Sequence, residues 1–160
     1  MDETIFEEIY EQTARPLWAY VSRISGNPTA ADDILQETYL RFLNSPPKQI
    51  DLKEAKPYLY KIATNLARDR FRKLKREGKQ ENILPEKCEM TIENFGEELE
   101  MTQVFSRLKE QERALLWLAY VEGYEHREIA GILRLNSMSV RVLLFRARRR
   151  LAQFLESEKR

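Results

Sequence analysis

The fold of this chain is decided by residues 112–151, which read ERALLWLAYVEGYEHREIAGILRLNSMSVRVLLFRARRRL. Residues 128–133 open a short amphipathic helix, because their isoleucines and leucine recur on one face at helical spacing. The next three residues, 134–136, are too few for anything but a turn. Asn136 or Ser137 can then accept a hydrogen bond from the free amides of the following helix. Two helices joined by so short a turn form a helix-turn-helix.

The helix that follows this turn is basic. It carries five arginines: Arg141, Arg146, Arg148, Arg149 and Arg150. A basic second helix suits the major groove of DNA, where phosphates supply affinity and base edges supply specificity. The plainer alternative is a three-helix packing unit whose basic face meets only solvent.

Length and composition indicate a soluble protein of one or two domains. The chain has 160 residues, of which 42% are hydrophobic and 33% charged, so it can bury a core beneath a charged surface. No run of about 18 apolar residues occurs, so we expect no membrane insertion. The start of the chain, Met1 to Thr4, is acidic where a secretory signal is basic, which indicates a cytoplasmic protein.

The formal net charge of +1 hides two basic blocks, residues 68–76 and 146–150. Between them, residues 77–100 hold eight glutamates and two lysines. Glycine and proline also interrupt this segment, and it has no helical period. We therefore predict an all-α chain of two small helical domains, residues 1–77 and 99–160, joined by a flexible acidic linker over residues 78–98.

Three helices are predicted in the first domain. Asn27 and Pro28 have the residue types favoured at a helix N-cap and first helical position, so the second helix starts there. Ser45-Pro46-Pro47 ends it. A loop then runs to Lys56, and Pro57 opens the third helix.

The third helix has an unusual composition. Residues 58–73 interleave aromatic side chains, one amide and several cations. Aromatic rings stack on unpaired bases and cations follow the phosphate backbone, which is a pattern for single-stranded nucleic acid. The alternative is a core helix with a charged outer face.

No enzyme site emerges from the sequence. His126 is the only histidine and Cys88 the only cysteine, so neither a clustered metal site nor a disulfide is expected. We expect no cofactor and no catalytic residues. A group of polar residues on the exposed face of the second helix (Asp33, Gln36, Glu37 and Arg41) would by default be a solvated surface.

Together these features resemble an extracytoplasmic-function sigma factor of the bacterial sigma-70 family, over nearly the whole chain. Residues 31–42 are similar to the segment with which that family grips core RNA polymerase. Residues 57–69 are similar to the segment that melts and reads the −10 promoter element. Residues 108–113 and 123–151 are similar to the domain that reads the −35 element.

The resemblance implies the partners and the contact residues. It assigns binding of bacterial core RNA polymerase to Asp33, Gln36, Glu37 and Arg41. It assigns contacts with −10 promoter DNA to Tyr58, Lys61, Asn65, Arg68, Arg72 and Lys73. It assigns contacts with −35 DNA to Ser137, Ser139, Arg141, Arg146, Arg148 and Arg149. It also implies a pocket for an extruded base between the loop at Ile50–Lys56 and Asn65, whose amide we expect to project toward that loop.

The sequence departs from the family pattern in two places. Arg134 stands where the turn usually has glycine, and a positive φ is disfavoured for other residues, so the geometry of the turn is open. Val142, Leu143 and Phe145 stand where polar or basic residues are more typical. Such an apolar patch also suits docking on an anti-sigma factor when DNA is absent.

Two other function classes compete with promoter recognition. A stand-alone helix-turn-helix regulator would bind duplex DNA tightly without polymerase, usually as a dimer on a palindrome. An enzyme acting on nucleic acid would need clustered carboxylates or histidines, and these are lacking.

Overall fold

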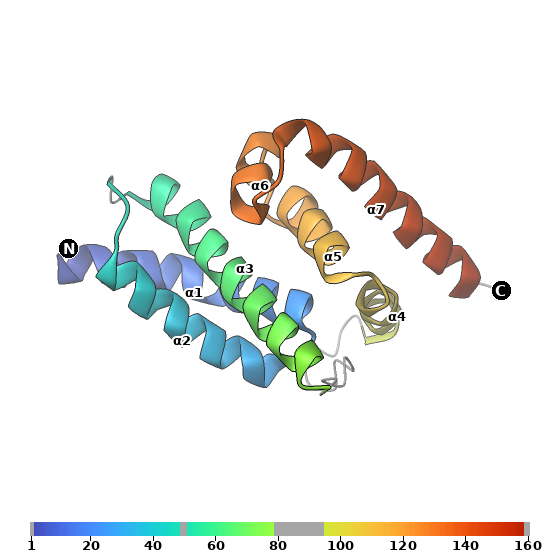
Figure 1. Ribbon diagram of the computed structural model, residues 1–160, viewed down its shortest axis with the longest axis horizontal. Coiled ribbons are helices and arrows are strands. Elements are labelled where there is room, and N and C mark those ends of the chain that lie inside the picture. Colours follow the sequence, from blue (N-terminus) through green and yellow to red (C-terminus); the bar gives the residue numbers. More distant parts are fainter. Residues whose placement is uncertain (1, 49–50, 79–94, 159–160) are drawn as a thin grey trace.

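The regular structure of this chain is helical wherever a computed structural model describes it, over residues 2–48, 51–78 and 95–158 (Figure 1). The all-α prediction is confirmed. The elements are α1 (Glu3–Ser25), α2 (Pro28–Asn44), α3 (Leu52–Arg76), α4 (Phe95–Ser106), α5 (Glu110–Leu116), the π-helical stretch η2 (Trp117–Val121), α6 (His126–Leu133) and α7 (Ser137–Glu158). Most of the predicted linker lies outside the described residues.

Side-chain caps fix the starts of the first three helices. The Asp2 carboxylate accepts the amide of Thr4 at 3.1 Å and begins α1. Asn27 caps α2 as predicted, with Pro28 at its first position. Asp51 accepts the amide of Glu54 at 2.8 Å, and α3 begins directly after it.

The prediction of a loop that extends to Lys56 is therefore wrong. Residues 52–56 already belong to α3, and Pro57 lies inside the helix instead of opening it. Proline lacks one amide donor. The Asp51 cap and the complete burial of Ala55 compensate by anchoring the turn that precedes it.

Helices α1, α2 and α3 pack around a core of large side chains. Leu17, Tyr20, Phe42 and Leu59 are fully buried there. Two buried tyrosine hydroxyls in this core are paired: that of Tyr20 lies 2.7 Å from the Thr64 hydroxyl, and that of Tyr39 lies 2.6 Å from the Thr13 hydroxyl.

The predicted helix-turn-helix is formed by α6, residues 134–136 and α7. Arg134 has φ 56° and ψ 47°, so the turn keeps left-handed geometry without glycine. The amide of Leu135 donates to the Ala130 carbonyl at 2.9 Å. The Asn136 side chain accepts the amide of Met138 at 3.0 Å and caps α7, as predicted.

The two halves of the chain pack against each other. Helix α1 contacts α5, and α3 contacts α6. The buried apolar side chains form one cluster that runs from α1 to α7. Figure 1 shows the result: α1–α3 form a bundle, α5 and α6 lie against it, and α7 lies on the far side of α5 and α6.

Candidate nucleic-acid interface

The polar group predicted on α2 lies on an exposed face of that helix. Asp33, Gln36, Glu37 and Arg41 are all exposed. Arg41 Nε lies 3.1 Å from Glu37 Oε1, and both side chains remain about half exposed, so the pair is solvent-screened and weak. Leu40 and Leu43 are exposed beside them, at 56% and 44%. These leucines were not predicted as site residues, although together with the charged group they make a surface suited to a protein partner.

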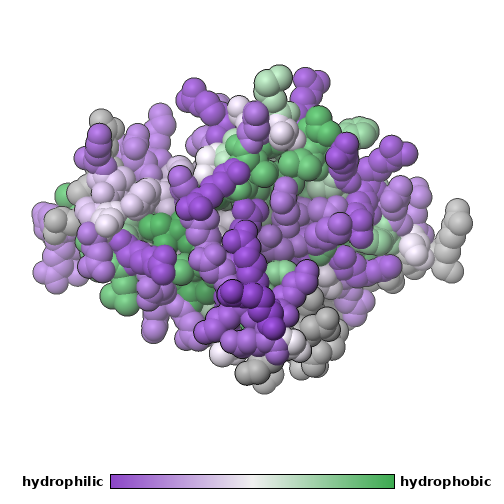
Figure 2. All heavy atoms as spheres, in the orientation of Figure 1, coloured by the Kyte–Doolittle hydropathy of each residue, from purple (hydrophilic) through white to green (hydrophobic). Residues whose placement is uncertain are grey.

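Helix α3 presents a polar stripe on its outer side. Lys61, Asn65 and Arg72 recur at helical spacing, with Lys61 and Arg72 exposed and Asn65 half-buried. Arg72 forms a surface ion pair with Asp69 at 3.7 Å. Lys73 is exposed near the end of the helix. Figure 2 shows strongly hydrophilic side chains gathered over this C-terminal end of α3.

Two other α3 residues lie differently from the prediction. The Tyr58 hydroxyl donates to the Ser45 carbonyl at 2.6 Å, and its ring lies 6.1 Å from that of Phe42. Tyr58 therefore ties α3 to the end of α2. Asn65 was expected to project toward a loop at Ile50–Lys56. Residues 52–56 belong to α3 itself, and Lys56 lies roughly 14 Å from Asn65 along the helix axis, so they do not form a pocket with it. Ile50 lies outside the described residues.

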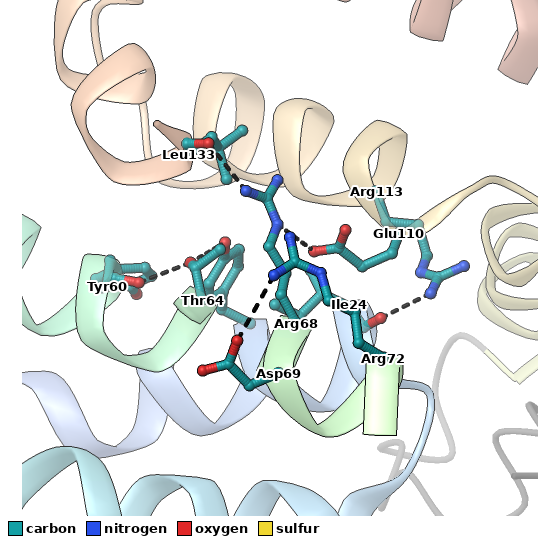
Figure 3. Close-up of polar contacts among 10 residues, drawn as sticks. Ile24, Tyr60, Thr64, Arg68, Asp69, Arg72, Glu110, Arg113 and Leu133 are labelled. Atoms are coloured by element: carbon teal, nitrogen blue, oxygen red, sulfur yellow. Dashed lines mark hydrogen bonds and ion pairs between the residues drawn. The ribbon is translucent and has the colours of Figure 1, made fainter. Parts of the chain in front are cut away.

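Arg68 points away from the polar stripe and into the second half of the chain (Figure 3). Its Nε lies 3.2 Å from Glu110 Oε1, and its Nη1 donates to the Leu133 carbonyl at 2.9 Å. The side chain is only 15% exposed. In this arrangement Arg68 is not available to a nucleic-acid phosphate.

Helix α7 presents a mixed apolar and basic face. Ser137, Arg141, Arg146, Arg148 and Arg149 are exposed, and Ser139 is half-buried. Three apolar side chains of α7 are also exposed, Met138, Val142 and Phe145, and Met138 is 84% exposed. Figure 2 shows apolar side chains near the start of α7 among hydrophilic ones.

A set of polar residues joins the two halves and was not predicted from the sequence. The Tyr60 hydroxyl donates to Glu122 Oε1 at 2.6 Å, and Lys56 Nζ lies 3.1 Å from Glu122 Oε2. Burial and this hydrogen bond raise the pKa of Tyr60 far above its ordinary value. These partners are 62 and 66 positions apart along the chain, so no local pattern marks them.

Arg113 is the most buried charge in this set, at 3% exposure. Its Nη2 donates to the Ile24 carbonyl in the last turn of α1 at 2.6 Å (Figure 3). Its Nη1 donates to the Leu108 carbonyl. Burial lowers its pKa below the ordinary arginine value.

Among the described residues, no three histidine, cysteine or acidic side chains are grouped so as to hold a metal ion. No helix in the described ranges is long and apolar enough to cross a membrane.

Comparison with known proteins shows the family. The family Sigma-70 region 2 matches residues 9–77, and Sigma-70, region 4 matches residues 98–151. The chain is 25% identical over 151 residues to the ECF RNA polymerase sigma factor SigM of Bacillus subtilis, covering 91% of each chain. It is 26% identical over 165 residues to the ECF RNA polymerase sigma factor SigL of Mycobacterium tuberculosis, covering 97% of this chain and 91% of SigL.

The fold is shared with a solved structure. The sigma factor RpoE from Bartonella quintana, crystallised with the anti-sigma factor NepR, superposes with a TM-score of 0.78 at 20% identity, over 94% of this chain and 96% of that one. Since both Sigma-70 regions occur in order along one all-helical chain, this protein belongs to the sigma-70 family and is an RNA polymerase sigma factor of the extracytoplasmic-function group.

Proposed function

We propose that this protein directs core RNA polymerase to its promoters through three separate surfaces, one each on α2, α3 and α7. The observation that carries the proposal is that all three surfaces present exposed side chains and lie within the two Sigma-70 regions. Along the chain they follow the order proposed for their roles: core binding, then −10 DNA, then −35 DNA. The division into residues 1–77, a linker over 78–98 and residues 99–160 is part of the proposal. A stand-alone regulator is not favoured, because two sigma regions account for most of the chain.

The α2 surface would bind core polymerase. It combines Asp33, Gln36, Glu37 and Arg41 with the exposed Leu40 and Leu43. Apolar side chains supply affinity when they are buried against a partner, and the surrounding charges supply orientation and association rate.

The α3 surface would hold the opened −10 element. Lys61, Arg72 and Lys73 are exposed cations that can follow a single strand, and the Asn65 amide offers both a donor and an acceptor to a base edge. Extruding a base costs a few kcal/mol, so contacts made only with the unpaired base favour strand opening. Tyr58 would act indirectly, by holding α3 against α2, and Arg68 would contribute only after leaving Glu110.

The α7 surface would lie in the major groove of the −35 element. Ser137, Ser139 and Arg141, at the start of the helix, would reach base edges, whereas Arg146, Arg148 and Arg149 would meet phosphates. The apolar side chains between them suit a protein partner when DNA is absent. We extend to this chain, as a proposal, an anti-sigma factor of the kind seen with the Bartonella protein.

Sigma factors are transcription initiation factors that act on RNA polymerase in the cytoplasm. We propose the same place for this chain, with no catalytic step and no cofactor of its own.

The α2 surface gives the experiment that tests the proposed function. Replacing Gln36 by Ala together with Glu37 by Lys should weaken binding to core polymerase at least tenfold, a loss of about 1.4 kcal/mol. The reason is that both changes remove polar side chains from the surface proposed to dock on the polymerase. Glu156→Lys, exposed on α7, is the matched charge control. The measurement is a fluorescence titration of core enzyme, with helicity checked by circular dichroism. Equal affinity of all three proteins would remove α2 from the core-binding surface.

A further inference from the structure

Helix α7 carries a row of apolar side chains on the face opposite the core. Met138, Val142 and Phe145 are spaced four and three positions apart, which keeps them on one side of a helix. They are 84%, 49% and 54% exposed. The buried residues of α7 lie on the other side of the helix: Val140, Leu144 and Ala147. The apolar row therefore faces directly away from the protein.

Arginines border the apolar row on both sides. At about 100° of rotation per residue, Arg148 lies on one side of the row and Arg146 on the other, and both are exposed. A helix in the major groove turns the middle of its outer face toward the base edges, and its flanks lie nearer the two phosphate backbones. With this face in the groove, the arginines meet phosphates and the apolar row meets bases.

The row is short and begins at the start of the helix. Met138 is the second residue of α7, and the residues at the start of a recognition helix are those that contact base edges. From Met138 to Phe145 the helix rises roughly 10 Å, at about 1.5 Å per residue. Since base pairs are stacked about 3.4 Å apart, the row spans about three of them.

Apolar side chains can read one feature of the base edges in the major groove. Thymine presents a C5-methyl group there, whereas a G·C pair presents hydrogen-bond donors and acceptors without a methyl. A valine or phenylalanine over a G·C pair would displace water from those groups and return no hydrogen bond. Over an A·T pair the same side chain buries the thymine methyl against carbon, which is favourable.

We propose that Met138, Val142 and Phe145 read thymine methyl groups in the −35 element, and that this sigma factor prefers promoters with neighbouring A·T pairs at these positions. The thymines can lie on either strand. This inference rests on the proposed function, because it needs α7 in the major groove of −35 DNA. The competing occupant of the row is a protein partner.

Selection of promoters tests the sequence preference. Holoenzyme made from core polymerase and the full-length protein transcribes a library of one of its promoters in which the −35 positions are randomised, and the transcripts are sequenced. The parent should enrich A·T pairs at about three neighbouring positions. Val142→Ala should relax the preference at one of them. Val121→Ala, the same change at a 60% exposed valine of η2, is the matched control and should keep the parent's preference.

Uracil tests the methyl group itself, because it is thymine without the C5-methyl. In the selected promoter, each −35 thymine is replaced by uracil in turn, and holoenzyme binding is measured by fluorescence titration. Loss of a contacted methyl should weaken binding about fourfold, the effect of exposing one buried carbon group. In Met138→Ala, Val142→Ala or Phe145→Ala holoenzyme, the loss at the thymine that the missing side chain contacts should fall below about twofold. All three side chains are about half exposed or more, so the fold should be kept, and circular dichroism checks it.

The outcomes separate this inference from the proposed function. Equal affinity for thymine and uracil at every −35 position would overturn methyl reading, and so would the same losses in the parent and in all three alanine variants. Either result would leave the sigma activity intact and assign the apolar row to a protein partner. A holoenzyme that selects no −35 sequence would instead count against the proposed function, and methyl reading would fall with it.

Discussion

Arg134 shows how a single residue can break a local preference without changing the fold. Its left-handed backbone, φ 56°, costs an ordinary L-residue about 1–2 kcal/mol. Hydrogen bonds of the turn offset this strain: the Leu135 amide donates to the Ala130 carbonyl, and the Asn136 side chain caps α7. The hydrogen bonds of the turn thus decide its geometry.

The strain at Arg134 gives a stability prediction. Arg134→Gly should raise the free energy of unfolding by up to about 1 kcal/mol, because relief of the left-handed strain exceeds the extra freedom of glycine in the unfolded chain. Arg134→Ala, which loses the exposed side chain but keeps the strain, is the control. The measurement is urea unfolding followed by circular dichroism. A glycine variant no more stable than the alanine variant would contradict the argument.

Buried tyrosines make the fold sensitive to alkaline pH. Burial raises the pKa of Tyr39 to about 12 and raises those of Tyr20, Tyr60 and Tyr124 as well. Since the folded values lie above the ordinary value of 10.0, the unfolded chain releases protons first. Stability should be complete below about pH 10 and fall above it by up to about 1.4 kcal/mol per pH unit for each such tyrosine.

Thermal melting across this pH range checks the prediction. Melting temperature should be nearly flat up to about pH 9.5 and fall steeply beyond it, with tyrosinate absorbance appearing together with unfolding. Tyr39→Phe should show a shallower alkaline decline. Ionisation of all the tyrosines near pH 10 with helicity unchanged would show that these hydroxyls are not buried.

Single-residue reasoning from the sequence failed for long-range pairs. Arg68 belongs to a basic block, and Glu110 and Glu122 look like ordinary surface acids. Their partners lie 42 or more positions away, so only the packing of the halves brings them together. Asn27 and Asn136 were predictable as caps because their partners lie two or three residues away.

At the scale of helices, periodicity predicted most of the fold. The start of α2 and the helix-turn-helix follow from apolar spacing and turn residues. The start of α3 did not, because Pro57 suits a first helical position while Asp51 is an equally good cap six residues earlier. Local preference allowed both starts, and burial of Ala55 at 0% exposure selects the earlier one.

Along helix α7, we expect Arg141 to contact bases and Arg149 to contact phosphates. Arg141→Ala should weaken binding to a −35 duplex by about 1–3 kcal/mol and relax sequence preference, because a base contact is lost. Arg149→Ala should weaken all duplexes alike and lower the salt slope by about one, because a phosphate contact is lost. Binding curves at several salt concentrations separate the two. The same slope and the same preference in both variants would refute this division.

At the scale of the molecule, the sequence predicted two helical units and their order but not their packing. The acidic segment over residues 77–100 marks a boundary in charge and period, which is why a linker was expected there. The contacts of α5 and α6 with α1 and α3 leave no such mark, since the polar partners that meet there are 42 or more positions apart along the chain. The candidate surfaces on α2 and α7 were predictable because each lies within one helix.

Transcription with purified core polymerase tests the central claim most directly. Genomic DNA of the source bacterium is transcribed by core enzyme with and without this protein, and RNA 5′ ends are sequenced. We expect a set of start sites that appear only when the protein is present and that share one −10 and one −35 sequence. Asn65→Ala should reduce the use of these start sites without altering the fold. Identical start sites with and without the protein, at concentrations where it binds core enzyme, would contradict the account.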